Sequence, residues 1–516
     1  MIIENLQKFK KFETTFLSVL LYIIVLVYAY QYSQIAGKYQ PWTTDEFFYY
    51  VEAKAIAAHN IYQTPVSLDG NTSYIGDFGF HGISYALKDG WLSKLFFHAQ
   101  DPPLIFINFL TFLAVLALIL LFKPFSINTR LKIALITATH YVLFSFTFSY
   151  MQETIQFLFA ILALRYLYLM FQNPPPPKKK DAARPQRPYA ALLSSWFPAP
   201  SREQARTSYL VIIILAITFR YGWFIWGLGL LPLAYDLKSF AKWSAIALVL
   251  LLFGIFISRY IMAPYPYNDL LADHLIRAEK FSILNSISLI YQRFVQNLQL
   301  FLTPSENIAT TCMRYLLLAL LIISAWYAFA KRNKFTIACT LIGWTYLIAC
   351  LTFYFVIGEY DERALAVLNP LLAFSLIGNF NSFIFYPVIA VQLLLFPGVV
   401  EATKARNERF IALNAPSSER ASREASYPKI KDLITDNQNV VVSMPILFIK
   451  HANPNYFVNF PLVTSKGYPI HYKIYRAGRD IRGTHNARYQ FTTQKSDTGD
   501  DNLVYFDQWW FLYRNF

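Results

Sequence analysis

Long apolar runs that recur along the chain constrain its fold more than any other feature. Several of them reach about 18–22 residues, enough for an α-helix to cross the roughly 30 Å hydrocarbon core of a bilayer. Only 15% of the residues are charged, whereas a soluble globular domain carries about 25%. We therefore expect an α-helical polytopic membrane protein rather than a soluble one.

The positions of these runs predict about eleven membrane spans. They cover residues 15–35, 104–122, 132–150, 153–171, 208–220, 222–235, 243–262, 313–330, 335–357, 364–379 and 383–400. The short fifth and sixth segments are also consistent with one broken helix or with a re-entrant segment.

Basic residues cluster in four of the loops between these spans, at 123–132, 178–206, 238–242 and 331–334. The positive-inside rule places such loops in the cytoplasm, in contact with membrane lipids. With eleven spans, all four fall on the side of the N-terminus. We therefore expect a multi-pass protein of the cell inner (plasma) membrane with a cytoplasmic N-terminus. The basic loops explain much of the net charge of +15, and we expect no nucleic-acid partner.

This orientation divides the chain into a transmembrane domain over 1–400 and a tail over 401–516. The segments 36–103 and 263–312 become extracytoplasmic loops, and 172–207 becomes a basic, proline-rich cytoplasmic loop. The tail contains no span. Its β-rich runs, broken by Gly, Pro and Asn, predict an extracytoplasmic soluble domain of the α/β or β-rich class. These runs lie at 440–443, 468–475 and 503–506.

Ionisable residues interrupt or flank the apolar runs in three clusters. A charge at the centre of a membrane helix costs about 2.5–3.5 kcal/mol on insertion scales, so such groups tend to persist where they line a polar cavity. All three clusters fall on the predicted outer side, which predicts a single extracytoplasmic site for an anionic, lipid-linked substrate. The clusters contain Asp45, Glu46, Asp77 and His81, then Glu153, Arg220 and Tyr221, and then Glu359 and Arg363.

Asp45 and Glu46 open an expected helix, for which two interpretations stay open. Thr43 and Glu46 have the spacing of a capping box, and Asp45 suits the start of a helix dipole. Alternatively, Asp45 shares a helix face with Tyr49 and Glu52 and acts as a general base beside the membrane.

The other candidates have structural alternatives as well. His81 lies in a glycine-rich turn and suits a structural role, and Glu153 suits the start of a span. Arg220 either extends to the lipid headgroups or grips a phosphate with its planar guanidinium. The turn from Glu359 to Arg363 either forms solvated ion pairs or contributes Arg363 to a phosphate site.

The order of these motifs resembles the GT-C glycosyltransferases, polytopic enzymes that take a sugar from a polyprenyl-phosphate carrier. The superfamily includes aminoarabinose transferases, protein O-mannosyltransferases and arabinosyltransferases. The resemblance rests on the Asp-Glu pair after the first span, the G-F-H-G-x-x-Y stretch from Gly79, the R-x-x-W stretch from Arg220, and the Glu-Arg pair before an apolar run with Pro370. It covers roughly residues 40–380 and leaves the tail and the proline-rich loop aside.

This resemblance implies a catalytic transmembrane domain over 1–400. Asp45, with Glu46 beside it, becomes the base that activates an acceptor, which is a glycan, lipid or protein. Arg220 and Arg363 become the groups that contact the donor phosphate, and Asp77, His81, Tyr221, Glu153 and Glu359 become substrate-binding residues. A divalent cation beside Asp45 stays open, because no three-ligand spacing accompanies it, and no other cofactor is expected.

Two further functions also place ionisable groups near membrane spans. One is a polytopic transporter or lipid flippase for an anionic or glycolipid substrate, and the other is a non-catalytic partner in lipid-linked assembly. The site of a carrier lies near the bilayer midplane, whereas these clusters fall at the predicted outer ends of spans. The glycosyltransferase is therefore the favoured interpretation.

Overall fold

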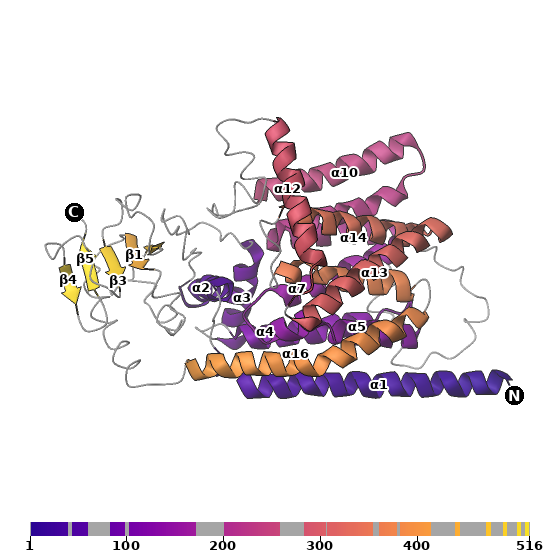
Figure 1. Cartoon of the computed structure of the whole chain (residues 1–516), viewed down its shortest axis with the longest axis horizontal. Helices are drawn as coiled ribbons and strands as arrows, with labels where there is room; N and C mark the ends of the chain where they lie inside the picture. The colour runs from indigo at the N-terminus through magenta and orange to yellow at the C-terminus, as the bar shows by residue number, and fades with distance from the viewer. Residues whose placement is uncertain are drawn as a thin grey trace.

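In the computed structural model of this protein, the helices form one bundle and a small β-sheet lies beyond it (Figure 1). The structure describes residues 2–39, 44–59, 83–98, 103–171, 201–257, 283–305, 307–353, 361–378 and 382–413, and five strands between 439 and 514. Every statement below concerns these residues.

The helical elements follow one another without a described strand until residue 439. The first half contains α1 (Ile2–Ile35), α2 (Thr44–His59), α3 (Ile83–Phe97), α4 (Leu104–Leu120), α5 (Ile127–Ala138), α6 (Tyr141–Thr147), α7 (Glu153–Phe171), α9 (Arg202–Phe219), the 3-10 helix η2 (Tyr221–Leu233) and α10 (Leu237–Phe256). The second half contains α12 (Ile283–Leu302), α13 (Ile308–Lys331), α14 (Lys334–Phe353), η4 (Asp361–Val367), α15 (Leu368–Leu372), η5 (Ala373–Ile377), η6 (Ser382–Ile384) and α16 (Phe385–Leu413).

Six described helices are long and apolar enough to cross a membrane, and three apolar segments are shorter. The six segments are Lys11–Ile35, Glu153–Phe171, Leu237–Phe256, Ile308–Lys331, Lys334–Thr352 and Phe385–Arg409. Every predicted span overlaps a described helical element, and the span predicted at 153–171 coincides with α7. The chain is an integral membrane protein with a polytopic helical fold. The count of eleven spans stays a prediction.

The span predicted at 132–150 is two helices rather than one. Helix α5 ends at Ala138 and α6 begins at Tyr141. Between them, His140 has an extended backbone, and its Nδ1 accepts a hydrogen bond from the Val142 N–H at 3.3 Å. The imidazole therefore caps a new helix inside an apolar run, and the pattern of apolar residues alone does not reveal such a break.

The segments predicted at 208–220 and 222–235 are also joined by a break. Helix α9 begins at Arg202 and ends before Arg220, whose backbone is extended at φ −154° and ψ 113°. The next segment, η2, is a 3-10 helix that contains Pro232. Similarly, the predicted span 364–379 consists of 3-10, α and π turns (η4, α15 and η5). Apolar periodicity does not separate these helix types, which differ by one residue in hydrogen-bond register.

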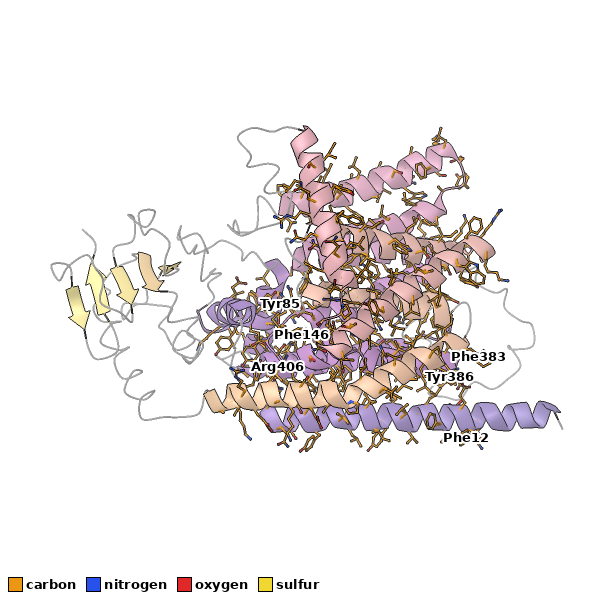
Figure 2. The ribbon with its side chains drawn as sticks, in the orientation of Figure 1. Phe12, Tyr85, Phe146, Phe383, Tyr386 and Arg406 are labelled. Carbon is orange, nitrogen blue, oxygen red and sulfur yellow. The ribbon has the colours of Figure 1, made fainter. Side chains whose placement is uncertain are left out.

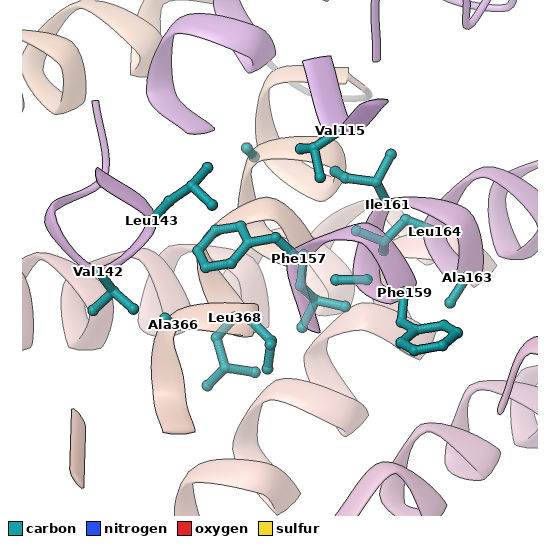
Figure 3. Close-up of a cluster of buried hydrophobic side chains, with 14 of the residues drawn as sticks. Val115, Val142, Leu143, Phe157, Phe159, Ile161, Ala163, Leu164, Ala366 and Leu368 are labelled. Carbon is teal, nitrogen blue, oxygen red and sulfur yellow. The ribbon is translucent and has the colours of Figure 1, made fainter. Parts of the chain in front are cut away.

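Helix α7 lies at the centre of the apolar core (Figure 3). Its Phe157 and Leu164 are fully buried, and side chains from α4, α6, η4 and α15 surround them. Association of helices in lipid depends on such close packing, because apolar side chains gain little by leaving an apolar solvent. The burial of α7 extends to its first turn, so the polar residues there are buried as well.

A polar cluster ties three helices together at one end of the bundle. Lys132 of α5 is buried, and its Nζ lies 2.6 Å from Oε1 of Glu13 on α1. The Tyr386 hydroxyl of α16 donates to the same carboxylate at 2.7 Å, and Asn128 Nδ2 donates to it at 2.6 Å. The carboxylate therefore holds the ends of α1, α5 and α16 in one position.

The five strands form one mixed sheet in the order β2-β1-β3-β5-β4. Strand β1 is parallel to β2 and β3, and β5 is antiparallel to β3 and β4. The strands are β1 (Asn439–Ser443), β2 (His471–Tyr475), β3 (Tyr489–Thr492), β4 (Leu503–Phe506) and β5 (Phe511–Arg514). The β-rich runs of the sequence correspond to β1, β2 and β4, whereas β3 and β5 were not predicted. A soluble domain over 401–516 stays a prediction, and α16 continues across its expected start to Leu413.

Helices α2 and α3 pack closely because α3 contains a glycine at the crossing. A Cβ atom on Gly90 would lie 2.6 Å from Ile56 Cβ and 2.9 Å from the Ala53 carbonyl oxygen. Both distances are too short for a methyl group. The close approach matters for the site, because α2 and α3 contribute several of its side chains.

We predict that Gly90→Ala lowers the thermal unfolding temperature of the protein in detergent. Inserting a methyl group into a packed contact costs about 1–3 kcal/mol, which corresponds to a fall of about 1–3 °C in a chain of this size. The matched control is Gly398→Ala in α16, where a Cβ would meet nothing within 4 Å. Circular dichroism melting of both variants tests the prediction, and an unchanged melting temperature for Gly90→Ala would contradict it.

Candidate functional site

Polar side chains from α2, α3, α7 and η4 meet at one end of the bundle. In Figure 2, Tyr85 and Arg406 lie at this end, and Tyr386 lies toward the opposite end. We call the region formed by Tyr39, residues 44–52, 84–89 and 149–156, and Arg363 the polar end.

The start of α7 is the centre of the polar end. Gln152, Glu153, Thr154 and Gln156 are all buried. The turn before them is held by Asn108 of α4, whose Nδ2 donates to the carbonyl oxygens of Ser149 at 2.9 Å and Met151 at 3.0 Å. Glu153 is the first residue of α7, where the helix dipole favours a negative charge.

Glu153 forms an ion pair with Arg363, the third residue of η4. Arg363 Nε lies 3.5 Å from Glu153 Oε1, and its Nη1 contacts the sulfur of Met151 at 3.8 Å. The Glu153 side chain is 3% exposed and that of Arg363 is 18% exposed. Glu153 is therefore more than a helix-start residue, because it holds a guanidinium from a segment that is 210 residues away in the sequence.

Several buried polar atoms in the first turn of α7 have no hydrogen-bond partner among the described residues. They are Glu153 Oε2, the Thr154 hydroxyl and the amide donor Gln156 Nε2. Buried polar atoms in proteins nearly always have a partner. Their concentration in one turn indicates a place where a ligand or water completes the hydrogen bonding.

Glu46 of α2 is buried, and its carboxylate accepts a hydrogen bond from Tyr39. The Tyr39 hydroxyl lies 3.0 Å from both carboxylate oxygens. The Tyr39 carbonyl oxygen in turn accepts from the Tyr150 hydroxyl at 3.0 Å, and Tyr150 stacks on Tyr50 of α2 with ring centroids 5.4 Å apart. Burial raises the pKa of Tyr39 well above its ordinary range, and the nearby Glu46 charge raises it further. The start of α2 is thus fixed to the turn before α7.

Glu52, two turns further along α2, is buried without a partner. Its side chain is 1% exposed, and neither carboxylate oxygen has a hydrogen bond in the described part of the chain. Burial raises the pKa of Glu52 to about 8, because an unpaired charge is unfavourable where water is excluded. Three residues earlier, Tyr49 accepts a hydrogen bond from Gln152 Nε2 at 2.6 Å, which places this face of α2 against the start of α7.

Helix α3 connects the same turn to the end of α9. The Tyr85 hydroxyl donates to the Tyr150 carbonyl oxygen at 3.1 Å, and the Ser84 hydroxyl lies 2.6 Å from that of Thr218. Burial raises the pKa of Tyr85, and the charge of Asp89, which pairs with Lys88 at 2.8 Å, raises it further. The contact with Thr218 joins α3 to the end of α9, two residues before Arg220.

Arg220 is the C-cap residue that follows α9, and its side chain is half-buried. Its carbonyl oxygen accepts from the Trp223 N–H at 3.1 Å, and the Trp223 indole donates to Gln156 Oε1 of α7. The R-x-x-W stretch is therefore anchored on the first turns of α7. Tyr221 is the first residue of η2.

Part of the predicted site lies outside the described residues. This holds for Asp77, His81 and Glu359, and the side chains of Asp45 and Tyr221 are not described. Asp45 is the second residue of α2, next to Glu46. Of the remaining candidates, Glu153 and Arg363 are in contact, and Glu46 and Arg220 lie on segments joined to the same first turns of α7. Their roles stay predictions.

The described residues contain no group of three or more His, Cys, Asp or Glu side chains that could hold a metal ion. Asp77, His81 and the side chain of Asp45 lie outside the described residues. The divalent cation considered beside Asp45 therefore stays a prediction.

A small apolar cavity of about 30 Å³ begins close to Arg363. Leu365 and Ala366 of η4 line it, together with Leu317 of α13 and the side chains of Asn369 and Arg314. Arg314 donates to the Leu300 carbonyl oxygen at 3.0 Å, so its guanidinium is held at the end of α12. Most of the other side chains that line the cavity are apolar.

Solved structures of two membrane proteins match nearly the whole length of this chain. ArnT from Cupriavidus metallidurans, solved bound to undecaprenyl phosphate, has a TM-score of 0.50 and 11% identity, with 98% of each chain covered. The archaeal oligosaccharyltransferase AglB from Archaeoglobus fulgidus, solved in complex with an inhibitory peptide and a dolichol-phosphate, has a TM-score of 0.50 and 14% identity. That match covers 94% of this chain and 70% of AglB. The chain has the GT-C fold.

This result confirms the fold that the resemblance in the sequence implies. At these sequence identities, the matches establish the GT-C fold but not the activity of this chain. No model of a known protein family matches the chain, and no curated protein matches it by sequence.

The polar end of this GT-C fold contains residues that sequence reasoning did not assign to the site. In the sequence, the only sign that Tyr39 and Gln152 belong to the site is their position close to Glu46 and Glu153 along the chain. The sequence predicts that Glu52 shares a helix face with Asp45. Nothing in the pattern shows that Glu52 is buried without a described partner. Tyr85 closes the G-F-H-G-x-x-Y stretch, and its place in that motif was the only available sign.

We predict that Glu52 makes the protein less stable as the pH rises. With a folded pKa of about 8 and an ordinary value of 4.5, the folded state binds more protons between these values. Stability therefore falls across this window, with each unit of pKa shift worth about 1.4 kcal/mol. Glu52→Gln removes this pH-dependent contribution to the free energy of unfolding. The substitution therefore raises the melting temperature at pH 8 more than at pH 5.

Melting temperatures of both proteins at pH 5 and pH 8 test this expectation. The control is Glu408→Gln, which changes an exposed glutamate of α16 that pairs with Lys404 at 3.7 Å. A pH dependence that is the same in Glu52→Gln and in the unchanged protein would contradict the assignment.

Proposed function

We propose that this protein is a glycosyltransferase that moves a sugar from a polyprenyl-phosphate carrier to an acceptor outside the cytoplasm. The acceptor is a glycan, a lipid or a protein. The proposed orientation has eleven spans, a cytoplasmic N-terminus, and loops 36–103 and 263–312 on the outer side of the cell inner membrane. The tail over 401–516 is proposed as a soluble domain on the same side.

The proposed reaction is a single displacement at the anomeric carbon of the donor sugar. Asp45 takes the proton from the acceptor, whose oxygen or nitrogen attacks the anomeric carbon as the bond to the phosphate oxygen breaks. The leaving polyprenyl phosphate keeps the electron pair, and Arg220 and Arg363 stabilise its growing negative charge. A single in-line displacement inverts the anomeric centre.

The Glu153–Arg363 ion pair is the observation that carries this proposal. The turn around Arg363 contains three acids beside one arginine, which is a poor phosphate site if the acids surround the guanidinium. In the structure, Glu153 engages the Nε side of the guanidinium from α7. This contact supports a role for Arg363 as a fixed cation at the polar end, with an apolar cavity wall beginning two residues later.

The two similar structures support the class of donor. ArnT was solved with undecaprenyl phosphate and AglB with a dolichol-phosphate, and both ligands are polyprenyl phosphates. A carrier that never leaves the bilayer fits a site built at the ends of membrane helices. The ionisable groups lie in the first turn of α2, at the start of α7 and at the end of α9, whereas a transporter or flippase binds its cargo near the midplane.

We predict that Asp45→Asn abolishes transfer while the protein still folds. Loss of a general base costs roughly 100- to 10,000-fold in rate. The measurement is mass spectrometry of membrane glycolipids and glycans from a strain that lacks this protein and carries either the unchanged gene or the variant. Equal restoration of the missing product by both genes would remove Asp45 from the mechanism.

We predict that Arg220→Ala and Arg363→Ala weaken the binding of undecaprenyl phosphate. A charge-assisted hydrogen bond contributes about 1.5–3 kcal/mol, which corresponds to at least a tenfold loss of affinity for each variant. The control is Arg202→Ala, at the opposite, exposed end of α9. Native mass spectrometry of purified protein with undecaprenyl phosphate measures the affinity. Unchanged affinity in both site variants would exclude a phosphate clamp.

A further inference from the structure

The outer part of α16 lies against the end of α6, and an arginine makes the contact. Arg406 Nη2 donates to the Ser145 carbonyl oxygen at 2.7 Å and lies 3.4 Å from that of Phe148. These carbonyls belong to the last turn of α6 and its C-cap, where no helical N–H remains to bond them. A guanidinium at a helix C-terminus also interacts favourably with the helix dipole. Arg406 thus caps α6 from a different helix.

The position of Arg406 is itself fixed by its neighbours on α16. Asn407 is fully buried, and its Oδ1 accepts from Arg406 Nε and Nη2, both at 3.3 Å. One turn earlier, the hydroxyl of buried Thr403 lies 3.1 Å from the Ser145 hydroxyl. This surface of α16 therefore makes specific contacts with α6, although residues 401–413 fall in the part of the chain where the sequence predicts a soluble domain.

The α6 end that Arg406 caps leads directly into the turn before α7. Phe148 is followed by Ser149, Tyr150 and Met151, whose contacts build the polar end. Tyr150 bonds to Tyr39 and accepts from Tyr85, and Met151 touches Arg363. The charge of Arg406 also acts on Tyr39, where it opposes the rise in pKa that burial produces. Figure 2 shows Arg406 at the same end of the bundle as Tyr85.

We propose that Arg406 is a positioning residue that sets the turn 148–151, and with it the Glu153–Arg363 and Tyr39–Glu46 pairs, so that the C-terminal part of α16 takes part in assembling the active site. This inference rests on the proposed function for its effect on catalysis. Its structural part is independent of that function. Arg406 itself has no described contact with the candidate catalytic groups and acts through the backbone of the turn.

The first test measures order in the turn directly. Hydrogen–deuterium exchange of Arg406→Gln is compared with that of the unchanged protein in detergent. We expect exchange in the peptide covering 145–153 to rise at least fivefold, while exchange in the second half of α7 stays the same. Arg406→Lys, which keeps the charge and one donor to a carbonyl, restores much of the protection. Unchanged exchange over 145–153 would overturn the proposal whatever the activity of the protein.

The second test separates positioning from general loss of stability. With a polyprenyl-phosphate sugar as donor, we expect Arg406→Gln to lower kcat about 10- to 100-fold, because misplacement by about 1 Å far from the chemistry can have this effect. The KM for the donor changes less than threefold, and Arg406→Lys recovers part of kcat. A rise in KM alone, or equal losses in the Gln and Lys variants, would contradict a positioning role.

Two control variants lie on the same helix. Arg409→Gln removes an exposed positive charge one turn from Arg406, and Thr403→Val removes the neighbouring hydroxyl contact without a change of shape. Both are expected to keep the exchange pattern and kcat within about twofold of the unchanged protein. An equal effect of Thr403→Val would assign the result to packing of α16 on α6 instead of Arg406. A complete absence of transfer by the unchanged protein, with exchange altered as expected, would reject the proposed function and leave the placement of Arg406 intact.

Discussion

The arrangement of this protein depends on the burial of a carboxylate–guanidinium pair at the start of α7, the most buried of the six described helices that are long enough to cross a membrane. Removing one partner of such a pair leaves an uncompensated charge away from water, at a cost of about 3–5 kcal/mol. Glu153 cannot leave the core, because the rest of α7 is packed on every side. Arg363 is therefore constrained to this place, and η4 and α15, which follow it in the chain, are positioned against α7. One ion pair thus fixes how the last third of the bundle meets the first.

Helix α16 carries a similar constraint along the length of the bundle. At one end Tyr386 bonds to Glu13, which also binds Lys132, and at the other end Arg406 bonds to the last turn of α6. Between these points, Gln392 accepts from Thr139 at 2.9 Å, and Phe396 packs edge-on against Phe144. A helix held at both ends transmits its position rigidly. The residues that follow Leu413 are therefore attached to the polar end through an ordered segment, which is what makes a contribution of the C-terminal region to the site physically reasonable.

The sequence was sufficient for features that depend on local composition. Apolar runs placed α7 at its observed bounds, and the ionisable clusters identified Glu153, Arg220 and Arg363 as residues of one end. It was insufficient for contacts between distant segments. The sequence did not predict that Arg363 pairs with Glu153, because side-chain pairing across the bundle leaves no local pattern. The break at His140 and the 3-10 form of η2 were not predicted for a related reason. Hydrophobicity indicates which residues are buried, but it does not indicate which hydrogen bonds the backbone makes.

The unpartnered atoms around α7 suggest how one end of a membrane fold can be both stable and reactive. Among the described residues, both carboxylate oxygens of Glu52 and one carboxylate oxygen of Glu153 have no hydrogen-bond partner. In an apolar bundle each such atom is unfavourable, by about 1–3 kcal/mol when nothing replaces the lost water. The remaining helices offset this cost through close packing, for which the fully buried Phe157 and Leu164 are examples. A substrate that donates hydrogen bonds to these acceptors, such as a sugar with several hydroxyls, would recover the energy on binding. Under the proposed function, the buried acceptors that cost stability are therefore groups that a polyhydroxylated substrate would bind.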